Sequence, residues 1–382
     1  MYCKMSGLES TTVSGFAVSL TNPGQNLSTR ADNTRDESCL IEDHILPRLD
    51  PSFVQYYTVV LSKKPQSHEV SLAETRSHPD LYRPTGSLDT SGYDRVVDHE
   101  VTSEDGFKIP VRLYYPEPKK FGNGPHPAHL NFHGGGFVFG DLSTDGQICL
   151  SMREAGIVVV DVGYRHCPET IWGKCIEDGW AALKWTRESS STLDINVASI
   201  SIGGISAGGH VSLVLQHIAR DSGIPLRLCM ASVPPSTDVL SYKSYTDSPF
   251  SSFHKFSHGP ILPWKRIQYF GNICMPQESL PELRAMWPDW WLAPIRAPNW
   301  TGLCDSFIRT AEIDPLRDEA EAYGAKLVAG GNKVTVKRYL GCPHIFMHIQ
   351  VMKQKGEYDV DAIIALKAAH GLSDLGLADA KT

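Results

Sequence analysis

The sequence predicts an α/β protein in which a mostly parallel central sheet is flanked by helices. Six unbroken apolar runs of strand length alternate with segments of helical spacing, a pattern typical of doubly wound sheets that are buried on both faces. Two of these runs end in glycine-rich turns. The 382 residues are 41% hydrophobic and 21% charged, which is the composition of a globular protein with a substantial core.

The predicted strands follow one another along the chain. Residues 93–115 alternate between apolar and polar positions on either side of a Glu-Asp-Gly turn, which predicts an antiparallel hairpin. The core strands are then expected at 128–132, 157–162, 198–202, 226–232, 307–310 and 334–339.

The remaining segments lie outside this alternation. We divide the chain into a mobile N-terminal arm at 1–36, an N-terminal helical cap segment at 37–92, the core at 93–235 and 301–382, and an inserted cap subdomain at 236–300. The insertion is too long for a simple loop and is rich in Pro, Trp, Phe and Ser. Its aromatic side chains are expected mostly to pack against the core, although some could form the wall of an apolar pocket.

A serine lies in the second glycine-rich turn. Gly204, Ser206 and Gly208 form a Gly-x-Ser-x-Gly motif between an apolar strand and a helical pattern. A serine in such a turn has a strained backbone and an exposed hydroxyl, while the glycines allow close passage of the neighbouring chain. A glycine-rich stretch can be no more than a tight turn, but this context favours Ser206 as a nucleophile.

The first glycine-rich turn, His133 to Gly136, follows the strand expected at 128–132. Three consecutive glycines allow backbone N–H groups to face a carbonyl oxygen, and the helix after Ser206 adds the N–H of Ala207. The pattern therefore predicts an oxyanion hole. A flexible connector is the alternative.

A nucleophilic serine needs a base and a carboxylate that orients the base. Asp314 and His344 each follow a predicted strand, at the sheet edge where catalytic groups of open α/β sheets gather. The order Ser206, Asp314, His344 is also the order that a triad takes in this strand, turn and helix architecture. We therefore predict Asp314 as the orienting acid and His344 as the base.

Four neighbouring residues are alternatives. Glu312 is the main rival for the acid, whereas Asp318 and Glu319 have the position of first-turn helix acids that interact with the helix dipole. His348 is the rival base, but it is expected in the helix after the loop.

A polar segment at 161–169 follows the strand expected at 157–162. Its Arg165 and Glu169 are expected to pair with each other. That pair would have a structural role, because it would hold loops under the site.

Charge and composition narrow the possible partners. A net charge of −7 argues against general binding to nucleic acids. Nine cysteines without CxxC pairs suggest neither a zinc site nor a disulfide framework and favour a reducing compartment. No apolar run approaches the ~20 residues of a membrane span. We expect a cytoplasmic protein that acts on a small molecule without a cofactor, a metal or a nucleic-acid partner, and a homodimer is left open.

Together these motifs resemble the hormone-sensitive lipase family of α/β-hydrolases, which includes arylacetamide deacetylase-like and bacterial family IV esterases. The likeness covers about 94–352 and rests on the His133 to Gly136 turn, the Tyr164-Arg165 and Pro168-Glu169 pairs, the serine motif, the run at 314–319 and His344. Ile205 departs from the Asp that many members have before the serine, without removing a catalytic group.

The resemblance implies an α/β-hydrolase fold with a helical cap and a serine carboxylesterase that hydrolyses a short-chain or aryl ester through an acyl-enzyme. It assigns the triad to Ser206, Asp314 and His344 and the oxyanion hole to Gly134, Gly135 and Ala207. Relatives of this kind occur in fungal secondary metabolism. An acyltransferase or cyclase with the same triad is an alternative. A non-catalytic small-molecule receptor is another, which His344 disfavours because the receptors of this family lack that histidine.

Overall fold

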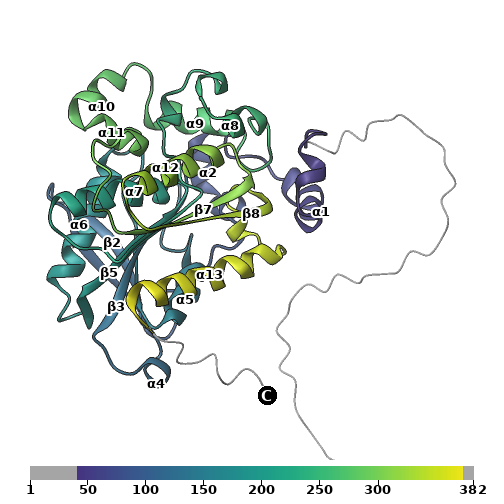
Figure 1. Ribbon diagram of the computed structural model, residues 1–382. Coiled ribbons are helices and arrows are strands. Elements are labelled where there is room, and N and C mark those ends of the chain that lie inside the picture. The colour runs from purple at the N-terminus through teal and green to yellow at the C-terminus, as the bar shows by residue number, and fades with distance from the viewer. Residues whose placement is uncertain (1–40, 373–382) are drawn as a thin grey trace, which may run out of the picture. The chain divides into compact units, whose positions relative to one another are not determined.

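An eight-stranded sheet forms the centre of the computed structural model, which describes residues 41–372 (Figure 1). The arm predicted at 1–36 lies outside the described residues. The strand order is β1-β2-β4-β3-β5-β6-β7-β8. Strand β2 pairs antiparallel with β1 and β4, and all other neighbours are parallel. The predicted mostly parallel sheet is therefore confirmed.

The six core strands and the hairpin all occur close to their predicted positions. The strands are β1 (Val96–Thr102), β2 (Lys108–Tyr114), β3 (His126–Phe132), β4 (Val158–Val162), β5 (Ile195–Ile205), β6 (Leu228–Ser232), β7 (Asp305–Ile313) and β8 (Val334–Pro343). Several run beyond the apolar stretch that predicted them, because backbone pairing with a neighbouring strand continues past that stretch. The extra residues carry β5, β7 and β8 up to the residues of the site.

Helices cover both faces of the sheet. One face is packed by α6 (Lys174–Glu188), α7 (Ala207–Asp221) and α12 (Arg317–Ala329), and the other by α5 (Gly146–Met152) and α13 (Lys353–His370). Successive strand side chains point to opposite faces, so Val160 belongs to the first buried cluster and Val159 to the second. Each fully buried Val or Leu contributes roughly 1.5–3 kcal/mol relative to exposure, so these apolar strands hold the layers together.

Short helices precede the sheet or connect its early strands. They are α1 (Pro51–Val59), α2 (Leu72–Ser77), α3 (Pro79–Tyr82) and, between β2 and β3, α4 (Pro118–Phe121). Pro51 occupies the first turn of α1, where its fixed φ suits the helix, and Asp50 caps the helix by accepting from the Ser52 N–H at 2.9 Å. Phe53 of α1 is fully buried in the cluster beneath α13, which joins this segment to the core.

The long connection between β6 and β7 is helical. It contains α8 (Ser251–Lys255), α9 (Trp264–Cys274), α10 (Leu280–Met286) and α11 (Asp289–Leu292), which lie above the sheet in Figure 1. Asp238 holds its two ends together by ion pairs with Arg284 at 3.0 Å and Arg296 at 3.1 Å. Trp287 donates to Glu177 of α6 at 3.1 Å and joins the connection to the core. No helix within 41–372 has the length and apolar character needed to cross a bilayer.

Helix α7 approaches the carboxyl end of β3 so closely that only glycine fits at position 208. A Cβ on Gly208 would lie 1.8 Å from the Phe132 carbonyl oxygen. We expect Gly208→Ala to lower the free energy of unfolding by about 3 kcal/mol or more, because backbone atoms on both sides must move. Urea unfolding followed by circular dichroism measures this loss.

Gly356, inside helix α13, is the matched control. A Cβ there meets nothing within 4 Å, and alanine has the higher helix propensity. We expect Gly356→Ala to keep or raise stability by up to about 1 kcal/mol. Equal losses in the two variants would contradict the close approach of α7 to β3.

Candidate active site

Ser206 is the single residue between strand β5 and helix α7. Strand β5 ends at Ile205 and α7 begins at Ala207, and Ser206 has φ 52 and ψ −115. A non-glycine residue in this region is strained. The strain is held by hydrogen bonds from the Ser206 N–H to the Ser232 carbonyl at 2.8 Å and from the His210 N–H to the Ser206 carbonyl at 3.0 Å. The turn therefore has the strained strand-to-helix geometry that the sequence predicted.

Three distant side chains form one hydrogen-bonded chain. His344 Nε2 lies 3.0 Å from Ser206 Oγ, and His344 Nδ1 lies 2.8 Å from Asp314 Oδ2. All three residues are buried, with Asp314 0% exposed. A carboxylate at Nδ1 favours the tautomer in which Nδ1 carries the proton, which leaves Nε2 free to accept the serine proton.

Neighbouring parallel strands bring the acid and the base together. Asp314 directly follows β7 and His344 directly follows β8, and Ile313 is paired with Pro343 across the two strands. Both side chains therefore leave the sheet at one edge. The Leu316 N–H donates to Asp314 Oδ1 at 2.9 Å and orients the carboxylate.

Glu312, the alternative acid, is not part of the hydrogen-bonded chain from Ser206 to Asp314. It accepts from Arg48 at 2.8 Å and from the Gly341 N–H at 2.8 Å. It therefore ties the segment before α1 to β8, three residues before His344. Glu312 has a structural partner on each carboxylate oxygen and no contact with the imidazole.

Asp318 and Glu319 lie in the first turn of α12, as predicted. Both also accept hydrogen bonds from the long connection between β6 and β7. Asp318 accepts from the Ser252 N–H at 2.8 Å, and buried Glu319 accepts from the Ser236 N–H at 2.6 Å and the Thr237 hydroxyl at 2.9 Å. Both carboxylates hold that connection to the core.

His348 lies in a short 3-10 helix, Phe346–His348, and not in the following α13. His348 therefore lies in a helix after the loop, as predicted, although this helix is short and α13 begins only at Lys353. His348 Nε2 lies 3.3 Å from Asp145 Oδ1, and Asn131 donates to the other Asp145 oxygen at 3.1 Å. The His348 imidazole therefore has its own buried carboxylate.

The expected pairing of Arg165 with Glu169 is wrong. Arg165 pairs with buried Asp178 at 2.7 Å and with Asp105 at 2.8 Å, whereas Glu169 pairs with Arg76 of α2. Neither residue lies in a helix or strand, so no regular spacing brings their side chains together. Each still joins a loop near the site to another segment.

The glycines predicted for the oxyanion hole line the same space as the serine. A Cβ on Gly134 would lie 3.6 Å from the Ser206 Cβ. Within 41–372, the N–H groups of Gly134 and Gly135 donate to no acceptor. Ala207 is the first residue of α7, where N–H groups have no acceptor within the helix. All three donors are thus available near Ser206.

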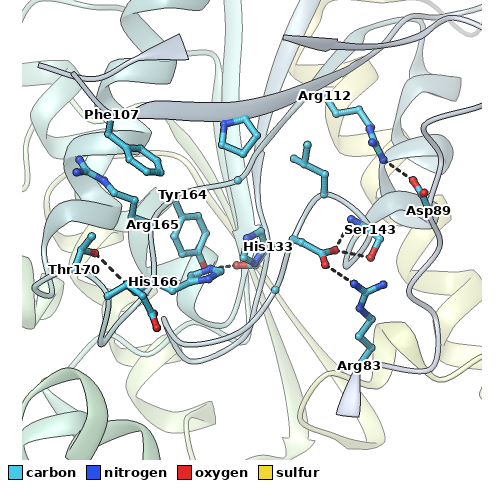
Figure 2. A pocket seen from close by; sticks show the side chains of 16 residues that line it. Arg83, Asp89, Phe107, Arg112, His133, Ser143, Tyr164, Arg165, His166 and Thr170 are labelled. Atoms are coloured by element: carbon cyan, nitrogen blue, oxygen red, sulfur yellow. Dashed lines mark hydrogen bonds and ion pairs between the residues drawn. The ribbon is translucent and has the colours of Figure 1, made fainter. Parts of the chain in front are cut away.

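Tyr164 supports the glycine turn from behind. Its hydroxyl donates to the His133 carbonyl at 2.7 Å, and its ring stacks on the His133 imidazole with centroids 4.4 Å apart (Figure 2). The His133 Nδ1 lies 2.7 Å from the Gly134 carbonyl oxygen. These contacts fix the backbone whose N–H groups face the serine.

Two neighbouring cavities meet at this turn. One, of about 530 Å³, is lined by Ser206, His344 and the glycines, by α2 and α3, and by Ile261, Leu262 and Phe270 of the long connection. The other, of about 600 Å³, lies behind the glycine turn and is lined by His133, Tyr164 and charged side chains (Figure 2). Of these two cavities, only the first is lined by Ser206 and His344, so we take it as the substrate cavity. Phe253 and Phe256, in contrast with Phe270, are fully buried packing residues.

Comparisons with known proteins agree with this geometry. A family model described as alpha/beta hydrolase fold matches residues 129–348. The AB hydrolase superfamily protein C1039.03 of Schizosaccharomyces pombe is 32% identical over 352 residues, which are 86% of this chain and 96% of that protein. Esterase LipI of Mycobacterium tuberculosis is 32% identical over 314 residues, 80% of this chain and 87% of that protein.

A solved structure shows the same likeness. The hyperthermophilic esterase from the archaeon Pyrobaculum calidifontis is 27% identical with a TM-score of 0.70, and the match covers 84% of this chain and 98% of that one. The α/β-hydrolase fold expected from the sequence is confirmed.

Glu319 should make the stability of the protein pH-dependent near neutrality. Burial raises the pKa of its carboxyl to about 7, although Ser236 and Thr237 donate to it. The folded state then keeps a proton that the unfolded chain loses near pH 4.5, so stability falls as pH rises from about 4.5 to about 7. We expect Glu319→Gln to remove this fall, which amounts to about 2 kcal/mol between pH 5.5 and pH 8.

Urea unfolding at pH 5.5 and at pH 8 measures the effect as the difference between the two free energies. Glu188→Gln, at the exposed end of α6, is the control and should keep the wild-type difference. A Glu319→Gln protein with the wild-type pH dependence would contradict the assignment.

Proposed function

Because the chain belongs to the α/β-hydrolase family of hormone-sensitive-lipase-like carboxylesterases, we propose that it hydrolyses a short-chain or aryl ester of a small molecule with Ser206 as nucleophile. The observation that carries this proposal is the continuous hydrogen-bonded chain from Ser206 through His344 to Asp314. A receptor that only binds its ligand has no use for this arrangement.

In the acylation step, Ser206 Oγ attacks the ester carbonyl carbon while His344 Nε2 takes the hydroxyl proton. Negative charge develops on the carbonyl oxygen, and the N–H groups of Gly134, Gly135 and Ala207 stabilise it. Asp314 stabilises the imidazolium that forms. His344 then donates its proton to the departing alkoxide, so an alcohol leaves and an acyl-serine ester remains.

Deacylation repeats these steps with water. His344 Nε2 takes a proton from the attacking water, the same N–H groups receive the new oxyanion, and the proton returns to Ser206 Oγ as the carboxylic acid leaves. Every proton is transferred through one imidazole, so the chemistry needs no metal ion and no organic cofactor.

The cavity supports a small substrate with apolar parts. Its volume of about 530 Å³ lies in the range of small-molecule sites, and Val138, Phe139, Leu262 and Phe270 contribute apolar walls. Walls from both the early helices and the long connection would define substrate shape. The role in fungal secondary metabolism, the cytoplasmic location and the homodimer stay predictions from the sequence.

Ser206→Ala should abolish the covalent step. We expect no labelling by a fluorophosphonate probe and a fall in kcat of about four orders of magnitude or more for p-nitrophenyl acetate, because triad members act as a unit. Mass spectrometry of the labelled wild type should locate the probe on the peptide containing residue 206. Labelling that persists in the variant would mean that another serine is the nucleophile.

Asp314→Asn should lower kcat for p-nitrophenyl acetate by about 10³-fold to 10⁴-fold, because the amide no longer holds the imidazole in its productive tautomer. Glu312→Gln is the matched control, since it removes a nearby carboxylate that contacts Arg48 and Gly341 instead of His344. Its kcat should stay close to that of the wild type. A larger loss in the glutamine variant would transfer the orienting role to Glu312.

A further inference from the structure

The substrate cavity is lined by one arginine that has no ion-pair partner among the described residues. Three arginines line it: Arg76, Arg83 and Arg266. Arg76 pairs with Glu169, and Arg83 pairs with Asp141 at 2.6 Å. No carboxylate among residues 41–372 lies within ion-pairing distance of Arg266. The first two charges are therefore paired directly within the protein, whereas Arg266 interacts with the Glu69 carboxylate only at longer range.

The contacts of Arg266 with neighbouring oxygens are neutral. Its guanidinium donates to the Ile261 carbonyl and to the Gln66 side-chain oxygen, and its buried Nε has no partner among the described residues. Burial lowers the pKa of Arg266 to about 10, so the group still carries its charge at neutral pH. Because buried charges are normally paired, this arginine has the surroundings of a group that binds an anion from outside the chain.

Arg266 lines the same cavity as Ser206 and His344 and makes no hydrogen bond to either side chain. Arg266 and Phe270 are four residues apart in α9 and share one helix face. Phe270 covers the glycine turn, since a Cβ on Gly136 would lie 2.5 Å from its ring. Arg266 is thus about one helical turn, roughly 6 Å, further along the cavity wall.

Arg266 also borders a side cavity of about 120 Å³ that shares several lining residues with the substrate cavity. The cations along the side cavity are Lys64, Arg83 and Arg266, and none of its lining residues is Asp or Glu. The chain as a whole carries a net charge of −7, so this positive region is a local feature and not a consequence of composition.

We propose that the natural substrate is an ester that carries a carboxylate on the part remote from the scissile bond, and that Arg266 binds this carboxylate at the side cavity. The planar fork of a guanidinium matches the two oxygens of a carboxylate and forms charge-assisted hydrogen bonds with it. This substrate class rests on the proposed esterase function. It adds a specificity-determining residue that acts on binding and not on the bond-breaking step.

Pairs of esters that differ only in charge test the proposal. Monoethyl succinate and ethyl butyrate have acyl chains of equal length, with a carboxylate or a methyl group at the end. 3-Acetoxypropanoate and propyl acetate place the same difference on the alcohol side. Acid release in a pH-stat gives kcat and KM for each ester, and the higher ratio of kcat/KM within a pair identifies the side that reaches Arg266.

In the wild type we expect the charged ester of at least one pair to have the higher kcat/KM. Arg266→Gln should lower that charged-to-neutral ratio roughly 10-fold to 100-fold, chiefly through KM, because the contact is the same in the ground and transition states. Arg266→Lys should give an intermediate ratio, since it keeps the charge and loses the fork. Lys265→Gln, an exposed neighbour outside the cavity lining, should keep the wild-type ratio.

Two results would overturn the substrate assignment while leaving the esterase proposal intact: a wild type that prefers the neutral ester in both pairs, and an Arg266→Gln ratio equal to that of the wild type. An equal fall in Lys265→Gln and Arg266→Gln would also overturn it, because the effect would then come from overall charge. A wild type that turns over neither these esters nor p-nitrophenyl acetate would overturn the esterase function and this inference together.

Discussion

The close contact between helix α7 and the end of strand β3 is the constraint on which the site depends. Gly204 and Gly208 leave no room for a Cβ at this contact, and so the chain must turn within the single residue Ser206. A strained residue of this kind costs about 1–3 kcal/mol and persists only where its surroundings determine it. Here the sheet, buried on both faces, supplies that rigidity, and the strained turn keeps the hydroxyl and the first N–H of α7 in one place.

The rest of the arrangement follows from parallel strands that end together. Because β7 and β8 are neighbours, Asp314 and His344 leave the same edge and meet over the serine. The three proposed catalytic residues therefore lie directly after strands of the buried sheet. The other walls of the cavity come from α2, α3 and α9, which belong to connections outside the sheet and can vary without disturbing the turn.

The polar residues around the site act mainly as tethers. Glu312 ties the segment before α1 to β8, Glu319 ties the start of the long connection to α12, and Asp145 holds His348. Glu312, Glu319 and His348 each lie within a few residues of a proposed catalytic side chain, and each has protein partners. Arg266 differs from them because its hydrogen-bond partners are neutral. Its charge is therefore available to a ligand, whereas the charges of the other groups are used to hold the fold together.

The amino-acid sequence by itself determined the positions of the strands along the chain and the two glycine-rich turns, because buried parallel strands and tight turns leave local signatures in apolar runs and glycine spacing. It also ranked Asp314 above Glu312 from loop position. Only the tertiary structure decided the ion-pair partners of Arg165 and Glu169, the separate carboxylate of His348 and the position of Arg266 on the cavity wall. Side-chain direction in a loop or a long connection depends on packing between segments far apart in the chain, and no local pattern records it.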